Sequence, residues 1–339
     1  MPAPRVDAEA LERGLERAVI PPRELGDVLI DQATARRLLR CDEAAIATLL
    51  AAGLPGFGAG EEGLRRCDVL NVGLYSGSGR TIPEIAEAHR VRFAAEPREN
   101  WLTPRAWDIS FDLRCPRGCA EGCWFLRRPS PERAGGAVVD WPATQARSGS
   151  SLRVAAQVIV AGAEGVVQPE GARMLFMELV DDLVHQRIRY QYLPPGLRRD
   201  PEAAVECRVL DCMAASLLLQ RRCQDLGLAA RTRKGLLLGA ATVEHVWLEL
   251  LGIDGGWVPM DPVLAALASR SGEGEGFVEF ACGSIANRLL RWELGADQEL
   301  LGHLCAGAGE PHRADDLLTT LSARSSRISA GRRSGQGNR

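Results

Sequence analysis

Apolar and polar positions follow a helical period in the first quarter of the chain. Residues 11–19, 32–39 and 43–52 carry apolar side chains at helical spacing. Asp31 and Asp42 stand where N-caps of the second and third segments belong, and Gly53 is suited to end the third. Residues 65–74 fit either a strand or a short helix. The pattern predicts a small module over residues 1–95, followed by a linker over 97–104.

The pattern then changes to the shorter period of strands. Residues 107–113, 124–126 and 151–160 alternate or are rich in apolar side chains, which predicts a β-rich segment over 105–165. A long amphipathic helix is expected over 173–189. Farther on, we expect a helical segment over 284–321 and a flexible tail over 322–339, because that tail contains Ser, Gly and Arg but very few apolar side chains.

Residues 206–262 combine one helix with three strands. A helix is predicted over 213–226 with Asp211 as its N-cap, which places Cys212 in the first turn. Strands are predicted over 230–238, 243–250 and 257–260. The two links between them are short and contain glycine, so an antiparallel meander is expected.

Composition restricts the class of protein without naming its function. The 339 residues suggest two domains or one large domain with an appendage, and the net charge of −3 provides no bulk positive field for nucleic acid. No apolar run approaches the roughly 20 residues of a membrane span. The first 24 residues lack the apolar core of a signal peptide, so a cytoplasmic protein with reduced cysteines is expected.

Three residues in the segment 206–262 can form a catalytic set. A thiol at a helix N-terminus has a lowered pKa, which suits Cys212 as a nucleophile. His245 lies near the start of the middle strand and Asp261 at the end of the last. Because antiparallel neighbours place the start of one strand beside the end of the next, these two become neighbours. Cys212 would attack, His245 would carry the proton, and Asp261 would orient the imidazole.

Four motifs in this segment resemble those of the transglutaminase-like superfamily. They are Cys212-x3-Ser216, Leu-Gly-Leu-Ala-Ala-Arg at 226–231, His-Val-Trp-Leu-Glu at 245–249, and Gly-Trp-Val-Pro-Met-Asp-Pro at 256–262. Leu210 and Ala229 depart from the Gly and Pro that the family often has. The resemblance implies an α+β catalytic core over 170–270 that forms a thioester acyl-enzyme and needs no cofactor.

The amino-terminal pattern of two short helices, a glycine loop and a strand resembles an excisionase-type winged helix-turn-helix. A DNA reader needs basic side chains on its second helix. Residues 42–55 contain no Lys or Arg and two acids. We therefore favour protein or peptide docking through residues 25–95 over binding of nucleic acid.

Other candidate residues carry weaker signals. Trp247 and Trp257 belong to the motifs and are candidates for substrate binding, Arg231 is expected to pair within the fold, and Gln191 is a minor candidate for an oxyanion donor. Cys115, Cys119 and Cys123 have neither the spacing nor the number of a zinc site, so no metal is expected, although Cys67 is a conceivable fourth ligand.

These features predict a cysteine-dependent acyl-transfer enzyme that forms or hydrolyses an amide bond. A peptide, carrier-bound or small acyl donor would suit it, as in peptide or natural-product biosynthesis, including that of antibiotics. One alternative is a cysteine peptidase or amidase. A second is a DNA-binding regulator whose cysteine domain is a non-catalytic sensor. The residues leave the acyl donor, the acceptor and the oligomeric state open.

Overall fold

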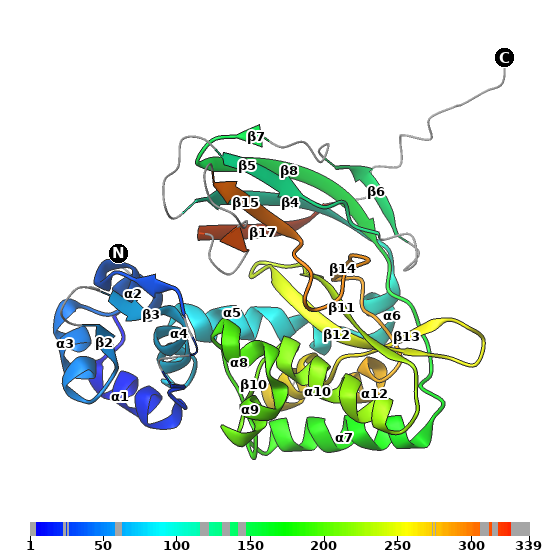
Figure 1. Cartoon of the computed structure of the whole chain (residues 1–339), viewed down its shortest axis with the longest axis horizontal. Helices are drawn as coiled ribbons and strands as arrows, with labels where there is room; N and C mark the ends of the chain where they lie inside the picture. Colours follow the sequence, from blue (N-terminus) through cyan, green and yellow to red (C-terminus); the bar gives the residue numbers. More distant parts are fainter. Residues whose placement is uncertain are drawn as a thin grey trace.

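A computed structural model gives the positions of most of the chain. It describes residues 5–22, 25, 27–57, 63–115, 122–130, 136–141, 147–272, 274, 276–305, 312–313 and 318–326. An amino-terminal module lies beside a central mixed region of helices and sheet, and two further β-sheets lie over that region (Figure 1). The fold is therefore α+β, as predicted. Within the described residues, no helix is both long and apolar enough to cross a membrane.

The amino-terminal module surrounds a small core with short helices. Asp31 and Asp42 cap the second and third helices by accepting the N–H groups of Thr34 and Ala45, as the sequence predicted. The helices are α1 (Ala8–Arg17), α2 (Gln32–Leu39), α3 (Glu43–Ala51) and α4 (Arg66–Leu74). The strands β1 (Leu29–Ile30), β3 (Gly63–Arg65) and β2 (Gly56–Phe57) form an antiparallel sheet in that order. Its likeness to a winged helix stays a prediction.

A helical connection begins with the last helix of the amino-terminal module and joins the module to the rest of the molecule. It contains α5 (Ile82–Val91), the 3₁₀ turn Arg92–Ala95 and α6 (Arg98–Leu102). The predicted linker over 97–104 is therefore wrong, because residues 98–102 form a helix. Trp101 is 3% exposed, and its ring lies 5.0 Å from that of Phe277 and 4.8 Å from that of Phe280. Burial of this side chain orders a segment whose local composition indicated a loop.

The β-rich segment is completed by strands from the carboxyl-terminal part of the chain. One sheet has the order β16-β15-β5-β7 and the other β17-β4-β8-β6. The two sheets share a buried core with parts of the central sheet. The strands are β4 (Arg105–Arg114), β5 (Gly122–Leu126), β6 (Ala137–Asp140), β7 (Arg147–Ser148), β8 (Ser151–Val160), β15 (Leu301–Cys305), β16 (His312–Arg313) and β17 (Leu318–Ser326).

The predicted helical segment over 284–321 is wrong. The described part of that range contains β14 (Leu289–Arg291), β15, β16 and the beginning of β17. β17 pairs antiparallel with β4 along its length, from Leu318 opposite Arg114 to Ser326 opposite Ala106. Pairing with a strand about 200 residues earlier overrides the local helical preference. The predicted tail over 322–339 likewise begins too early, since residues 322–326 belong to β17; residues 327–339 lie outside the described part.

The central region places helices against a four-stranded antiparallel sheet in the order β13-β12-β11-β14. The meander is confirmed, with β11 (Ala230–Leu237), β12 (Val243–Leu251) and β13 (Trp257–Met260) close to their predicted bounds. The helices are α7 (Glu170–Val184), α8 (Pro195–Arg199), α9 (Pro201–Glu206), α10 (Cys212–Asp225), α11 (Pro262–Ser271) and α12 (Phe277–Ala281). A short parallel pair, β9 (Arg189–Tyr190) and β10 (Val209–Leu210), precedes α10.

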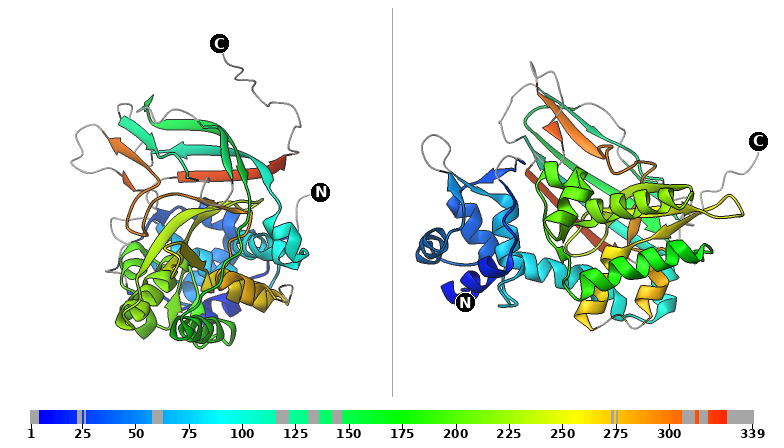
Figure 2. Two further views of the ribbon diagram at one scale, coloured as in Figure 1. Left: turned by 90° about the vertical axis from the view of Figure 1, so that its right-hand side faces the viewer. Right: turned by 60° about the horizontal axis from the view of Figure 1, so that its bottom comes forward.

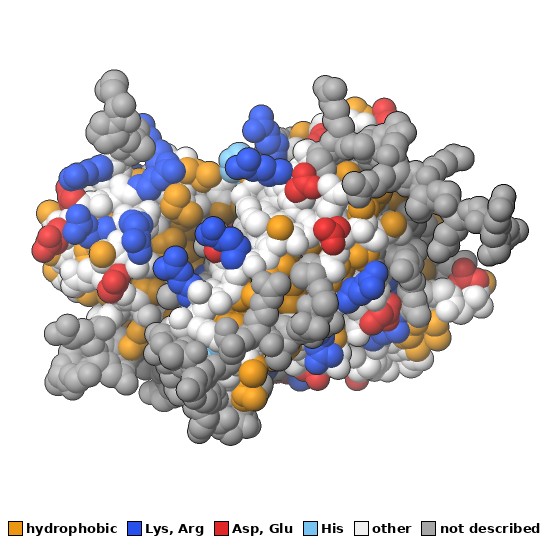
Figure 3. Space-filling view, turned by 90° about the horizontal axis from the view of Figure 1, so that it is seen from above, with side chains coloured by type: hydrophobic (Ala, Val, Ile, Leu, Met, Phe, Trp, Pro, Cys, Tyr) orange, Lys and Arg blue, Asp and Glu red, His pale blue; other side chains and the backbone are white. Residues whose placement is uncertain are grey.

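The outer sheets stay above the central region in further views of the molecule. Figure 1 shows α7 along the lower surface of the central region and the amino-terminal module beside that region, and both views of Figure 2 show the two outer sheets above it. Seen from above, basic side chains lie over the amino-terminal module with acidic side chains among them (Figure 3). This face therefore carries both signs of charge.

Candidate active site

Cys212 is the first residue of α10, and Asp211 is its N-cap. One carboxylate oxygen of Asp211 accepts the N–H of Ala214 at 2.8 Å, and the other accepts the Nε–H of Arg198 at 2.5 Å. The cap is 3% exposed, whereas the Cys212 thiol is partly exposed. The prediction of Asp211 as the cap is confirmed. The helix thus presents a thiol to solvent at its positive end.

Ser216, one turn along α10, ties this end of the helix to the sheet. Its hydroxyl lies 2.7 Å from the carbonyl oxygen of Cys212 and 3.1 Å from that of Val246 on β12. Val246 is also the neighbour of His245 in sequence. The first turn of α10 and the start of β12 are therefore held in contact through a buried side chain.

His245 and Asp261 meet across the sheet. His245 Nε2 lies 2.6 Å from Asp261 Oδ2, and both residues are buried. The antiparallel pairing of β12 and β13, with Leu248 opposite Met260, brings them to the same edge. The second carboxylate oxygen of Asp261 accepts the N–H of Leu264 at 3.0 Å and caps α11. One residue thus begins a helix and holds the imidazole.

The pKa of His245 shows how the three side chains act on one another. Burial lowers this pKa, but the charge and hydrogen bond of Asp261 raise it, as do the hydrogen bond and charge of Cys212, to about 10. Because Nε2 is bound to Asp261, Nδ1 is the ring nitrogen left for the sulfur. The imidazole is therefore held in its protonated form at neutral pH, between a carboxylate and a thiol.

The two motif tryptophans lie in different surroundings. Trp247 is fully buried, and its ring stacks at 26° to that of His245 with 6.2 Å between centroids. Trp257 lies opposite Leu251, at the end of β13 away from Asp261, and Arg231 covers its ring at 3.7 Å. Arg231 also pairs with Glu249 at 2.8 Å, so its predicted role within the fold is confirmed. Neither tryptophan lines the cavity beside Cys212.

The other described cysteines differ from Cys212 in burial or in their partners, although Cys67 lines the same cavity. Cys115 and Cys223 are buried, Cys123 is exposed, and Cys119 lies outside the described residues. Burial raises the pKa of the Cys67 thiol well above its usual value, and this thiol donates to Asp27 at 3.3 Å. Within the described part of the chain, no three His, Cys, Asp or Glu side chains are grouped to hold a metal ion.

A cavity of about 350 Å³ opens beside Cys212, and the sequence did not predict its walls. The central region contributes Tyr190, Tyr192 and Arg198. The amino-terminal module contributes side chains from α4 and α5, among them Leu70 and Ala86. These positions carry no motif, and only the tertiary arrangement brings them to the cysteine.

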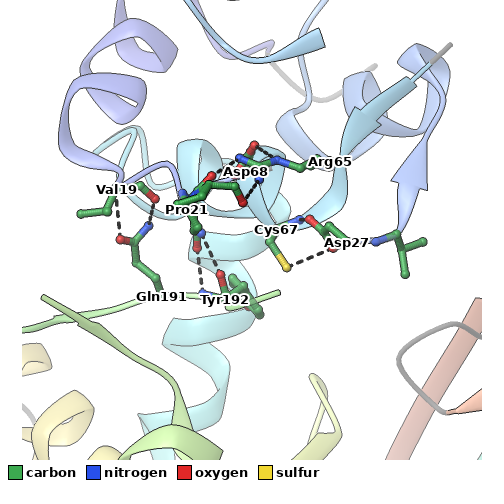
Figure 4. Close-up of polar contacts among 11 residues, drawn as sticks. Val19, Pro21, Asp27, Arg65, Cys67, Asp68, Gln191 and Tyr192 are labelled. Carbon is green, nitrogen blue, oxygen red and sulfur yellow. Dashed lines mark hydrogen bonds and ion pairs between the residues drawn. The ribbon is translucent and has the colours of Figure 1, made fainter. Parts of the chain in front are cut away.

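The amino-terminal module is joined to the segment before the cysteine by reciprocal amide contacts (Figure 4). Asn71 donates to the carbonyl oxygen of Tyr192 at 2.9 Å and accepts its N–H at 2.8 Å. Gln191 accepts the N–H of Val19 at 3.1 Å and donates to its carbonyl oxygen at 3.4 Å. The amide of Gln191 is therefore engaged with Val19, which argues against its role as an oxyanion donor.

The same segment is paired with the strand that leads into Cys212. Tyr75, the C-cap of α4, donates its hydroxyl to the carbonyl oxygen of Tyr190 at 2.7 Å. The N–H of Gln191 in turn donates to the carbonyl oxygen of Leu210 at 3.0 Å, two residues before Cys212. Contacts thus run from the amino-terminal module through residues 190–192 to the start of α10.

Comparison with known proteins identifies the central region. Residues 161–262 match the family model described as the transglutaminase-like superfamily, so the chain contains a domain of this superfamily. The predicted resemblance is confirmed for that range. No curated protein matches the chain.

Two solved structures are similar to parts of the chain. A candidate cysteine protease from Cytophaga hutchinsonii is 11% identical, with 66% of this chain and 91% of that chain covered and a TM-score of 0.39. The periplasmic domain of TgpA from Pseudomonas aeruginosa, bound to ethylmercury, is 16% identical, with 55% of this chain and 98% of that chain covered and a TM-score of 0.26.

Proposed function

We propose that this chain, whose residues 161–262 form a transglutaminase-like superfamily domain, is a cysteine-dependent acyl-transfer enzyme. In this proposal Cys212 is the nucleophile, His245 carries the proton and Asp261 orients the imidazole. The observation that carries it is the 2.6 Å contact between His245 and Asp261 next to a partly exposed thiol at a helix N-terminus. A transglutaminase-like domain with this arrangement supports a cysteine-dependent enzyme.

The first half of the reaction forms a thioester. The Cys212 sulfur, as a thiolate, attacks the carbonyl carbon of the acyl donor and forms a tetrahedral intermediate. Ala214 already gives its N–H to Asp211, so the preceding N–H groups of Cys212 and Met213 are the candidates to bind the oxyanion. When the intermediate collapses, His245 gives its proton to the leaving amine, thiol or alcohol.

The second half returns the enzyme to its starting state. An amine or a water molecule gives a proton to His245 and attacks the thioester carbon, and the Cys212 thiolate leaves. Attack by an amine forms an amide, and attack by water hydrolyses the donor. We propose the amine as the acceptor and a place in peptide or natural-product biosynthesis, with the amino-terminal module as a docking platform. A cytoplasmic location, where the thiol stays reduced, belongs to the same proposal.

The experiment that tests the proposal follows the acyl group by intact mass. Wild-type protein is mixed with a peptide amide or a small acyl thioester, and the adduct is located by peptide mapping. We expect the adduct on residue 212, and Cys212→Ala should lower turnover by at least about 10⁴-fold, as loss of a nucleophile does elsewhere. Cys207→Ala is the matched control, since this thiol is also partly exposed and lies five residues earlier.

The acceptor is tested in the same reaction with and without a primary amine. Amide formation at the expense of the free acid supports transfer, whereas the free acid alone supports the peptidase or amidase alternative. An adduct on any other cysteine, or turnover that survives Cys212→Ala, would contradict the proposed enzyme.

A further inference from the structure

We propose that the cavity between the amino-terminal module and Cys212 receives a bulky apolar group of the acyl donor, next to the reacting carbonyl. This inference rests on the proposed function, because it treats Cys212 as the residue that takes the acyl group. It adds that the amino-terminal module is a wall of the active site and selects the donor. If the module only docked the substrate away from Cys212, the catalytic domain alone would select the donor.

The position and size of the cavity indicate which part of the donor enters it and how large that part is. The cavity measures about 350 Å³, at the small end of the roughly 300–1,000 Å³ range of ligand pockets. Cys212 and Asp211 lie in its lining, so a carbonyl carbon at the sulfur places the adjoining part of the donor inside it. The volume suits one large side chain or a short acyl chain.

The walls of the cavity are mostly apolar and come from both sides. Leu70 on α4 and the α5 residues Ile82, Pro83 and Ala86 form the wall of the amino-terminal module. The opposite wall contains apolar and aromatic side chains of the central region: Tyr190, Tyr192, Leu193, Pro195 and Val243. Apolar surfaces facing each other across an open space stabilise an apolar occupant by removing its surface from water.

Most of the charged side chains in the described lining have partners within the fold, and one of them, Glu244, pairs with Lys234 at 3.8 Å. Arg198 pairs with Asp211 at 2.5 Å, and Asp27 accepts the N–H and the thiol of Cys67 at 2.8 and 3.3 Å. Arg90 donates to the hydroxyl of Tyr192 at 3.0 Å. The lining therefore favours an uncharged apolar group of the donor over a carboxylate or an ammonium group.

The wall is built in place before any donor binds. The reciprocal amide contacts of Asn71 with Tyr192 and of Gln191 with Val19 fix the module against residues 190–192 (Figure 4). Arg65, buried at 2% exposure, pairs with Asp68 at 2.6 Å and donates to the carbonyl oxygen of Pro21 at 2.8 Å. A preformed wall loses little conformational entropy on binding and so discriminates between donors of different size.

The test compares two alkylating reagents at Cys212, iodoacetamide and its N-benzyl derivative, in the full-length chain. The rate of modification of residue 212 is followed by peptide mapping, so the measurement does not require turnover. Ala86→Trp fills the cavity and should slow the benzyl reagent by about tenfold, the size of effect that a misfitted apolar group produces in a pocket. The rate with iodoacetamide should change by less than about twofold, which separates size selection from a damaged thiol.

The chain offers a matched control on the same helix. Ala88 on α5 is exposed and does not line the cavity, so Ala88→Trp should leave both rates unchanged. Ile82→Trp is the second variant, because Ile82 lines the cavity and is 37% exposed, which makes a larger side chain tolerable to folding. Ile82→Trp should slow modification of Cys212 by the benzyl reagent as Ala86→Trp does.

The outcomes separate this inference from the proposed function. If Ala86→Trp and Ile82→Trp change neither rate, or lower both rates equally, the cavity does not receive the apolar group and the inference is overturned. If labelling selects for size but Cys212 takes no acyl group from any donor, the proposed function fails and the inference about the cavity stands.

Discussion

Strand β12 carries two buried polar residues, His245 and Glu249, four positions apart, and the two differ in the partners that surround them. His245 meets one carboxylate, that of Asp261, and its other neighbour is the partly exposed thiol of Cys212. Glu249, 1% exposed, meets three guanidinium groups, those of Arg231, Arg233 and Arg291, at 2.8, 3.1 and 2.5 Å. The first cluster contains two groups that can exchange a proton during a reaction, the imidazole and the thiol, whereas the partners of Glu249 are guanidinium groups, which keep their protons in proteins.

The difference teaches how a reactive cluster can be told from a structural one on the same strand. Both clusters bury ionised groups, so burial of charge does not separate them. The two clusters differ in access from the cavity. Cys212 and Asp211 line that cavity, whereas Glu249 lies within the fold and none of its three arginines lines the cavity. We therefore expect changes at Asp261 to act on the reaction and changes at Glu249 to act on stability.

The largest expected effect is on the reaction, in Asp261→Asn. Asn can still accept the N–H of Leu264 and cap α11, so the change removes the charge beside His245 and keeps the helix start. We expect turnover to fall by up to about 10⁴-fold, as for the equivalent change in a Ser-His-Asp triad. Single-turnover acylation of Cys212 measures it, with circular dichroism as the control for folding.

The same variant has a distinct dependence on pH. The pKa of His245 is about 10, above the unfolded value of about 6.5, so its protonation stabilises the fold fully below pH about 6.5. That contribution is lost as the pH rises through about 10. The difference in unfolding free energy between wild type and Asp261→Asn should therefore shrink between pH 7 and 10. Urea unfolding at several pH values measures it, and a constant difference would contradict the raised pKa.

The next effect in size is on stability, in Glu249→Gln. Removal of one partner from a buried ionic cluster leaves the others uncompensated and costs about 3–5 kcal/mol of unfolding free energy. Turnover per folded molecule should remain within about twofold, since Glu249 touches no proposed reacting group. Glu202→Gln is the matched control: Glu202 pairs with Arg221 at the surface, and its loss should cost less than about 1 kcal/mol. A large loss of turnover in Glu249→Gln would contradict the assignment of the Glu249 cluster to stability alone.

The sequence predicted the first cluster because its signals are local. Asp211 before a helix, short glycine-containing links between strands, and His245 and Asp261 at strand ends each depend on a few neighbouring residues. These rules, together with the family motifs, placed the three side chains near one edge. For the second cluster the sequence predicted only that Arg231 pairs within the fold, because Arg291 reaches Glu249 through the pairing of β14 with β11, which no local pattern reports.

The parts that the sequence did not predict depend on distant contacts. Strands β15 and β17 pair with β5 and β4, whose residues lie far earlier in the chain, and residues 284–321 were therefore predicted as helix. Asn71 and Tyr192 are 121 residues apart, so their amide contacts and the wall beside Cys212 followed only from the structure. Local periodicity carries no information about such pairings.

The smallest expected effect is in Arg231→Ala, which removes one of three cations from the Glu249 cluster. Arg231 is 30% exposed, and Arg233 and Arg291 stay in place, so we expect a loss of about 1.5 kcal/mol, the low end of the range for one hydrogen bond to a charged group. Thermal and urea unfolding measure the loss. A loss as large as that of Glu249→Gln would mean that the three arginines act as one unit.

Arg231→Ala also tests whether Trp257 binds substrate. Arg231→Ala uncovers the Trp257 ring, which lies at the end of β13 away from Asp261. If Trp257 binds substrate, exposing its face should change KM for an aromatic or cationic donor, because both would gain a ring to stack on. An unchanged KM with lowered stability would assign Trp257 and Arg231 to the scaffold. The cavity beside Cys212 would then remain as the place where the donor is selected.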